Sequence, residues 1–165
     1  MNKLLTVSVI ALSSVISCMG CSTTAKPPDV PLSRIDPGLK PYVDKFYLEC
    51  QKHNPNPESC APLIKLTVRV KQTEENVLGV CYVYGKPYEY VRDIHISPNV
   101  VLNETLLAVV MYHELMHCVL GYQHFDAQLD IMNSYLNDES TAYFVKYWDF
   151  FLKTVFDREE NTDGQ

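Results

Sequence analysis

The chain has 165 residues, a length typical of one domain, and 47% hydrophobic and 21% charged residues, as in ordinary globular proteins. With 14 basic and 20 acidic side chains, its formal net charge is −6. This balance argues against a nucleic-acid-binding protein, because such a protein needs a basic surface to contact phosphates.

The first twenty residues have the features of a signal peptide. An early lysine precedes an apolar run from Leu4 to Ile16, and small residues and cysteines follow. A run of this length is short for a membrane-spanning helix but suits the hydrophobic part of an export signal. Residues 1–20 are therefore expected to direct export from the cytoplasm.

The end of this segment resembles the lipobox of bacterial lipoproteins, in which a cysteine is lipidated and becomes the first residue of the mature protein. The residues before Cys18, Val15-Ile16-Ser17, fit that pattern well, and we favour Cys18 as the lipidated residue. Cleavage before Cys21 is an alternative, because it leaves an even set of cysteines in the rest of the chain. An ordinary secretory signal is a second alternative. A lipidated protein would be held on a membrane of the bacterial envelope.

Composition divides the rest of the chain into three parts. Residues 21–35 are rich in Pro, Ser and Thr, which predicts a flexible tether. Residues 36–156 carry the large apolar side chains and are expected to form the folded domain. Residues 157–165 are polar and charged, as in a solvated tail.

The first half of the domain is predicted to contain one helix and three strands. Asp36 suits the N-cap of a helix, and Pro37 suits its first position. Apolar residues then recur at helical spacing as far as His53. β-Branched and alternating residues predict strands over 63–70, 77–85 and 88–97.

The second half of the domain is predicted to contain two helices. Asn103 can cap a helix that ends at Gly121, and a final amphipathic helix covers residues 139–156. The order of helix, strands, helix and helix predicts a small α+β domain, with a short mixed sheet packed on the helix before Gly121.

The remaining cysteines of an exported protein can form disulfides. Cys50 and Cys60 flank a turn-rich loop, which favours a local bridge between them, and Cys81 would then pair with Cys118. In a reduced chain, all four would be small buried side chains.

The segment HELMHCVLGYQH, residues 113–124, contains three of the chain's five histidines. His113 and His117 are four residues apart on the predicted helix, so both imidazoles lie on one face and can bind a single Zn²⁺. Glu114 lies about 100° around the helix from His113, where it can accept a proton from water at the metal without binding the metal itself.

A catalytic zinc site needs a third protein ligand. Gly121 is placed to end the helix, and the chain that turns back from it can present the imidazole of His124. A turn at Ile131-Met132-Asn133 follows.

This segment resembles the zinc motif of the metzincins, HExxHxxGxxH, which a Met-turn follows. It has one extra residue between His117 and Gly121. It is more similar to short bacterial lipoprotein-type metallopeptidases, whose HELGHCLLG-like stretches share the longer spacing, and the likeness covers most residues from Asp36 to Leu136. The resemblance implies a zincin-like domain in which His113, His117 and His124 bind zinc, Glu114 is the base and Met132 lies beneath the metal.

Other residues are alternative or additional candidates. Tyr135 lies three residues after Met132, near the place where some metzincins have a tyrosine that contacts the metal or the transition state. The stretch from Asn137 to Ala142 resembles the second helix of the gluzincins, in which Glu139 would replace His124 as the third ligand.

The sequence thus predicts a zinc-dependent peptide-bond hydrolase held in the bacterial envelope by an N-terminal lipid. Its substrate would be a peptide or protein, which could add as a strand to the edge offered by residues 88–97. A lipoprotein that binds zinc without catalysis is the non-enzymatic alternative.

Overall fold

The computed structural model describes residues 34–54, 58–60, 66–84, 91–125, 130–136 and 138–156. The expected signal peptide, the tether up to residue 33 and the tail from residue 157 lie outside these ranges. Within them, no helix combines the length and the apolar character that crossing a membrane requires.

The first helix, α1, spans Lys40–His53, with Pro41 in its first turn. The expectation that Asp36 caps this helix is wrong, since Leu39 is the N-cap residue. Asp36 instead forms a turn, and its carboxylate accepts a hydrogen bond from the backbone N–H of Val70, 2.6 Å away. The start of α1 is thereby fastened to the sheet.

Within the described ranges, the sheet is mixed and has three strands, β1 (Leu66–Val70), β2 (Gly79–Tyr84) and β3 (Val91–Ile96), in the order β1-β3-β2. β1 runs parallel to β3, and β2 runs antiparallel to it. The expectation that residues 88–97 offer a free edge is therefore wrong, because β3 is central and β2 is the edge strand. β3 has four buried residues and β2 none, so burial favours the central position for β3.

Ile35 extends the folded domain by one residue beyond the expected boundary. Its side chain is buried in the core, and its backbone forms a parallel bridge with Val68 of β1. The segment expected to be a tether thus ends in an apolar residue that packs within the domain.

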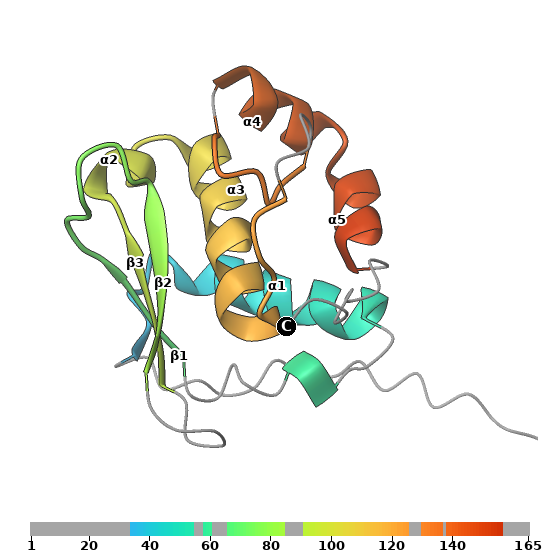
Figure 1. Cartoon of the computed structure of the whole chain (residues 1–165), viewed down its shortest axis with the longest axis horizontal. Coiled ribbons are helices and arrows are strands. Elements are labelled where there is room, and N and C mark those ends of the chain that lie inside the picture. The colour runs from blue at the N-terminus through green and yellow to red at the C-terminus, as the bar shows by residue number, and fades with distance from the viewer. Residues whose placement is uncertain are drawn as a thin grey trace, which may run out of the picture.

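The central helix of the fold is α3, Glu104–Leu115, which follows the short helix α2, Pro98–Val101. As expected, Asn103 caps α3 by accepting a hydrogen bond from the N–H of Leu106. Figure 1 shows the sheet on one side of α3 and the C-terminal helices on the other. Buried residues occupy most positions of the second half of α3, as in a helix surrounded by the core.

The expected C-terminal helix is divided into α4 (Asp138–Lys146) and α5 (Trp148–Phe156), separated at Tyr147. The two parts have different partners, since α4 packs on α3 and α5 packs on α1 (Figure 1). A single straight helix could not follow both surfaces, and packing with these two partners accounts for the division.

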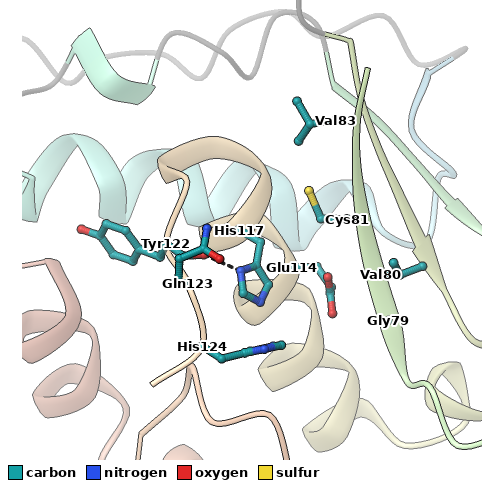
Figure 2. Close-up of a pocket in the computed structure, with 9 residues that line it drawn as sticks. All are labelled: Gly79, Val80, Cys81, Val83, Glu114, His117, Tyr122, Gln123 and His124. Atoms are coloured by element: carbon teal, nitrogen blue, oxygen red, sulfur yellow. Dashed lines mark hydrogen bonds between the residues drawn. The ribbon is translucent and has the colours of Figure 1, made fainter. Parts of the chain in front are cut away.

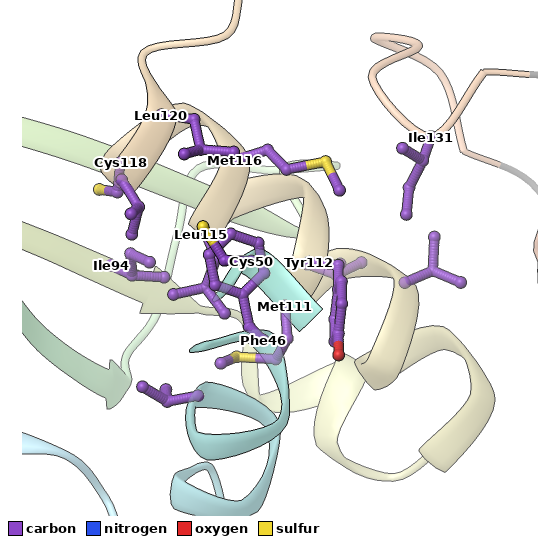
Figure 3. Close-up of a cluster of buried hydrophobic side chains, with 14 of the residues drawn as sticks. Phe46, Cys50, Ile94, Met111, Tyr112, Leu115, Met116, Cys118, Leu120 and Ile131 are labelled. Atoms are coloured by element: carbon purple, nitrogen blue, oxygen red, sulfur yellow. The ribbon is translucent and has the colours of Figure 1, made fainter. Parts of the chain in front are cut away.

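Two disulfides join elements of the domain, Cys50–Cys60 and Cys81–Cys118, which confirms the expected pairing. They close loops of 10 and 37 residues, and loops of these sizes correspond to stabilisation of about 2–4 kcal/mol each in a chain-entropy treatment. Figure 3 shows the core that they border, where Phe46 of α1, Ile94 of β3 and Tyr112 of α3 are among the buried side chains.

Candidate metal centre

Three imidazole rings converge beside the end of α3. The Nε2 atom of His113 lies 3.0 Å from that of His117 and 3.2 Å from that of His124. Nitrogen atoms bound tetrahedrally to one zinc ion at 2.0–2.1 Å would lie about 3.3 Å apart. The three rings therefore have the spacing of ligands that share one metal ion.

The outer nitrogen atoms of two rings are held by backbone carbonyl groups. His113 Nδ1 donates to the carbonyl oxygen of Ile131 at 2.6 Å, and His117 Nδ1 donates to that of Tyr122. A carbonyl oxygen only accepts, so each Nδ1 carries the proton and each neutral ring keeps an Nε2 lone pair. Carbonyl partners of this kind orient metal-binding histidines in proteins.

Burial keeps these two rings neutral. It lowers the pKa of His113 to about 4, and the carbonyl of Ile131 opposes this effect only in part. Burial also lowers the pKa of His117. At neutral pH both imidazoles are unprotonated, the form in which histidine binds metals. By their spacing, His113, His117 and His124 could hold a metal ion. The rings of His113 and His117 also have the tautomer and the neutral form that this requires.

The extra residue before Gly121 is accommodated by a turn of π-helix. The segment η3, Met116–Leu120, continues α3 with the wider π-helical turn and carries His117. Gly121 then adopts the left-handed conformation (φ 74°) that favours glycine and ends the helix. The wider turn takes up the additional residue, so the chain still returns to place His124 beside His113.

Met132 lies in the turn that holds His113. Its side chain is fully buried, and its N–H is held by the carboxylate of Asp130 at 2.8 Å. The carbonyl oxygen of Met132 accepts a hydrogen bond from the N–H of Phe125. This turn thus joins the segment that follows His124 to the helix that carries His113.

Glu114 lies between the imidazoles and the edge strand. Its side chain is buried, and its carboxyl accepts a hydrogen bond from the backbone N–H of Cys81. Burial raises the pKa of Glu114 to about 8, and the Cys81 hydrogen bond opposes that rise. In the metal-free protein the carboxyl is therefore poised to exchange a proton near neutral pH.

Gly79 permits the close approach of β2 to this carboxyl. A Cβ atom at Gly79 would lie 2.8 Å from Cγ of Glu114 and 2.8 Å from Cγ1 of Val110. Such distances are too short for non-bonded carbon atoms, so a larger residue would push the strand away from α3. An isolated glycine within a strand pattern is a signal of close backbone approach that sequence reasoning could have used here.

Two cavities open on either side of Glu114. One, of about 350 Å³, is lined by Cys81 and Val83 of β2 and by His117 and His124 (Figure 2). The other, of about 290 Å³, is lined by His113, His124 and Tyr135 among others. Together they place open space along β2 on both sides of the three imidazoles.

The predicted site residues differ in where the structure places them. It brings together His113, Glu114, His117 and His124, as expected. Tyr135 lines the second cavity with its side chain 84% exposed. Cys118, beside His117, forms a disulfide.

The backbone of Glu139, the alternative third ligand, belongs to the first turn of α4, but its side chain lies outside the part of the chain that the structure describes. Sequence reasoning missed the backbone groups of Cys81, Tyr122 and Ile131.

We predict that Glu114→Gln stabilises the metal-free protein increasingly as pH rises. The pKa of Glu114 is about 8 in the folded protein, above the ordinary value of 4.5, so folding favours the protonated form. The proton therefore contributes its full stabilisation below about pH 4.5. This stabilisation is lost as pH rises through about 8, because the unfolded chain ionises at the lower pH and the folded protein only at the higher one. Glutamine stays neutral, so the excess stability of the variant should grow over this range. Urea unfolding of chelator-treated proteins at several pH values measures it, and a constant difference contradicts the prediction.

Comparison of the chain with protein-family profiles, with curated proteins and with solved structures found no match.

Proposed function

We propose that this protein is a zinc-dependent peptide hydrolase of metzincin-like type. The observation that carries the proposal is the convergence of three imidazole Nε2 atoms beside the buried carboxyl of Glu114. Three nitrogen ligands leave a fourth position of a tetrahedral zinc ion open, as catalytic zinc sites require. The all-imidazole donor set suits zinc better than calcium or magnesium, which prefer oxygen.

In this proposal Glu114 acts first as a general base and then as a general acid. The chemistry that zinc supplies when bound is Lewis acidity, which polarises a carbonyl group and acidifies water. Glu114 takes the proton of the attacking water and later delivers it to the leaving amine. The Cys81 N–H orients the carboxyl for both transfers, while Ile131 and Tyr122 hold the ligand rings.

The edge strand β2 suits the binding of an extended peptide. Among the described residues β2 pairs only with β3, so its outer side borders the cavities beside the imidazoles. An extended peptide can add to such an edge through backbone hydrogen bonds, which would carry a scissile bond past Glu114. Tyr135, at the mouth of the second cavity, is our candidate for a contact to the reacting carbonyl.

The proposal is tested by zinc content and peptide cleavage together. We expect one zinc ion per purified protein and hydrolysis of an unfolded casein-type substrate that a chelator stops and added zinc restores. Stoichiometric zinc without cleavage of any unfolded protein or envelope protein would favour a zinc-binding protein without catalysis. A protein that binds no zinc excludes both functions.

The two disulfides indicate an oxidising, exported environment for the domain. We propose in addition that an N-terminal lipid on Cys18, or alternatively on Cys21, holds it on a membrane of the bacterial envelope. Mass spectrometry of the native N-terminus should find a diacylated or triacylated cysteine. An unmodified N-terminus on a protein free in the soluble fraction contradicts this prediction.

A further inference from the structure

We propose that the Cys81–Cys118 disulfide positions the general base, because it holds the edge strand β2 against Glu114. Hydrolysis would then depend on the oxidation of this pair, whereas metal binding would not. The proposal rests on the proposed function for its catalytic consequence, but its structural part can be tested without activity.

The position of the Glu114 carboxyl follows the position of β2. Its hydrogen bond comes from the backbone N–H of Cys81, which lies in the edge strand. Gly79 lies two residues earlier, so it is on the same face of β2 as Cys81, and a Cβ atom added there would overlap the side chain of Glu114. Any movement of β2 away from α3 would therefore break the hydrogen bond and open space beside the carboxyl.

Packing alone holds β2 weakly. None of its residues is fully buried, and Tyr82, Val83 and Tyr84 are 37%, 50% and 52% exposed. The strand is retained by its hydrogen bonds to β3 and by the covalent bond from Cys81 to the buried Cys118. The disulfide thus adds a covalent attachment between β2 and η3, the continuation of α3, to the close approach at Gly79.

The metal ligands are held by other parts of the chain. The rings of His113 and His117 are oriented by the carbonyl groups of Ile131 and Tyr122, and His124 follows Gly121 along the same loop. None of the three imidazoles belongs to β2. Although Cys118 is adjacent to His117, opening the disulfide removes no group that orients an imidazole, so zinc should stay bound when β2 is released.

One half of the disulfide, Cys81, lines the cavity beside His117 and is partly exposed, whereas Cys118 is buried (Figure 2). A dithiol can open it by exchange: the disulfide accepts two electrons and two protons and becomes two thiols, while the dithiol becomes a cyclic disulfide. In an oxidising environment the bond persists and the base stays in position.

The test compares two double variants, Cys81→Ala with Cys118→Ala and, as a matched control, Cys50→Ala with Cys60→Ala. The control removes the disulfide between Cys50 of α1 and Cys60, and neither cysteine belongs to β2 or lines the two cavities beside the imidazoles. Hydrogen exchange over residues 79–84, zinc content and kcat with KM are measured for each. We expect the first variant to exchange the β2 amides at least ~10-fold faster, to keep its zinc, and to lose at least ~10-fold in kcat. The control should match the wild type in all three.

If the β2 amides of the two double variants are equally protected from hydrogen exchange, the proposal is overturned. It is also overturned if the Cys81→Ala, Cys118→Ala variant loses its zinc along with the protection of these amides. If the first variant does not fold, native wild-type protein is treated with a phosphine, and alkylation followed by mass spectrometry identifies the opened disulfide before exchange is measured. If the wild-type protein cleaves no substrate, the proposed function is refuted. The hydrogen-exchange measurement still decides, in that case, whether the disulfide holds β2. A wild type whose cleavage is unchanged after Cys81–Cys118 is opened refutes the positioning role.

Discussion

Replacing Glu114 by glutamine is expected to lower the rate of hydrolysis by at least ~10²-fold while zinc remains bound. Glutamine keeps the shape of the side chain and an oxygen that can accept from the Cys81 N–H, so β2 should stay in place. It cannot take a proton from water. Loss of the general base should therefore appear in kcat, with KM and zinc content close to those of the wild type.

A suitable control is Glu104→Gln, which removes a carboxylate from the first turn of the same helix. Its effect should be confined to helix stability, at most about 1 kcal/mol, because it lies far from the imidazoles along α3. A Glu114→Gln variant with near wild-type turnover would remove Glu114 from the mechanism. Loss of zinc from that variant would instead make Glu114 a ligand.

His124→Ala is expected to weaken zinc binding strongly, whereas Glu139→Ala should leave it nearly unchanged. The imidazole of His124 lies within 3.2 Å of His113 Nε2, where it completes a three-nitrogen site. Loss of an outer-shell partner alone costs about 10–100-fold in metal affinity, so loss of a direct ligand should cost more. Glu139 stands in the first turn of α4, where a carboxylate already has a favourable position at a helix N-terminus.

Competition of each variant with a chromophoric zinc chelator measures these affinities side by side. Far-ultraviolet circular dichroism shows whether each variant keeps its helices. If Glu139→Ala loses zinc and His124→Ala keeps it, the third ligand is a carboxylate and the gluzincin-type alternative replaces the metzincin-like one. Equal losses would mean that both residues contribute to the metal site.

Several features of the site depend on local geometry, and these could be predicted from sequence. The four-residue spacing of His113 and His117 places both rings on one helix face wherever that helix forms. Asn103 and Gly121 mark its ends by capping chemistry that involves only neighbouring residues, and the structure confirms both. The return of the chain to His124 was also predictable, because few residues separate it from Gly121.

Other features depend on which distant segments pack together. The central position of β3, the separation of α4 from α5 and the approach of β2 to Glu114 all arise from such contacts. The extra residue before Gly121 could have extended an α-helix or widened a turn, and the structure has a π-helical turn there, with four of its five residues buried.

The sequence by itself therefore determined the helical pair His113 and His117 and the adjacent Glu114. It favoured the cysteine pairing that the structure shows. Only the tertiary structure decided that Cys81 supplies the hydrogen bond to Glu114 and that β3 is central while β2 is an edge strand among the described residues. The physical reason is that helix periodicity and capping act over about one turn. Strand order and close approach, in contrast, are set by the burial of apolar surface between segments remote in the chain.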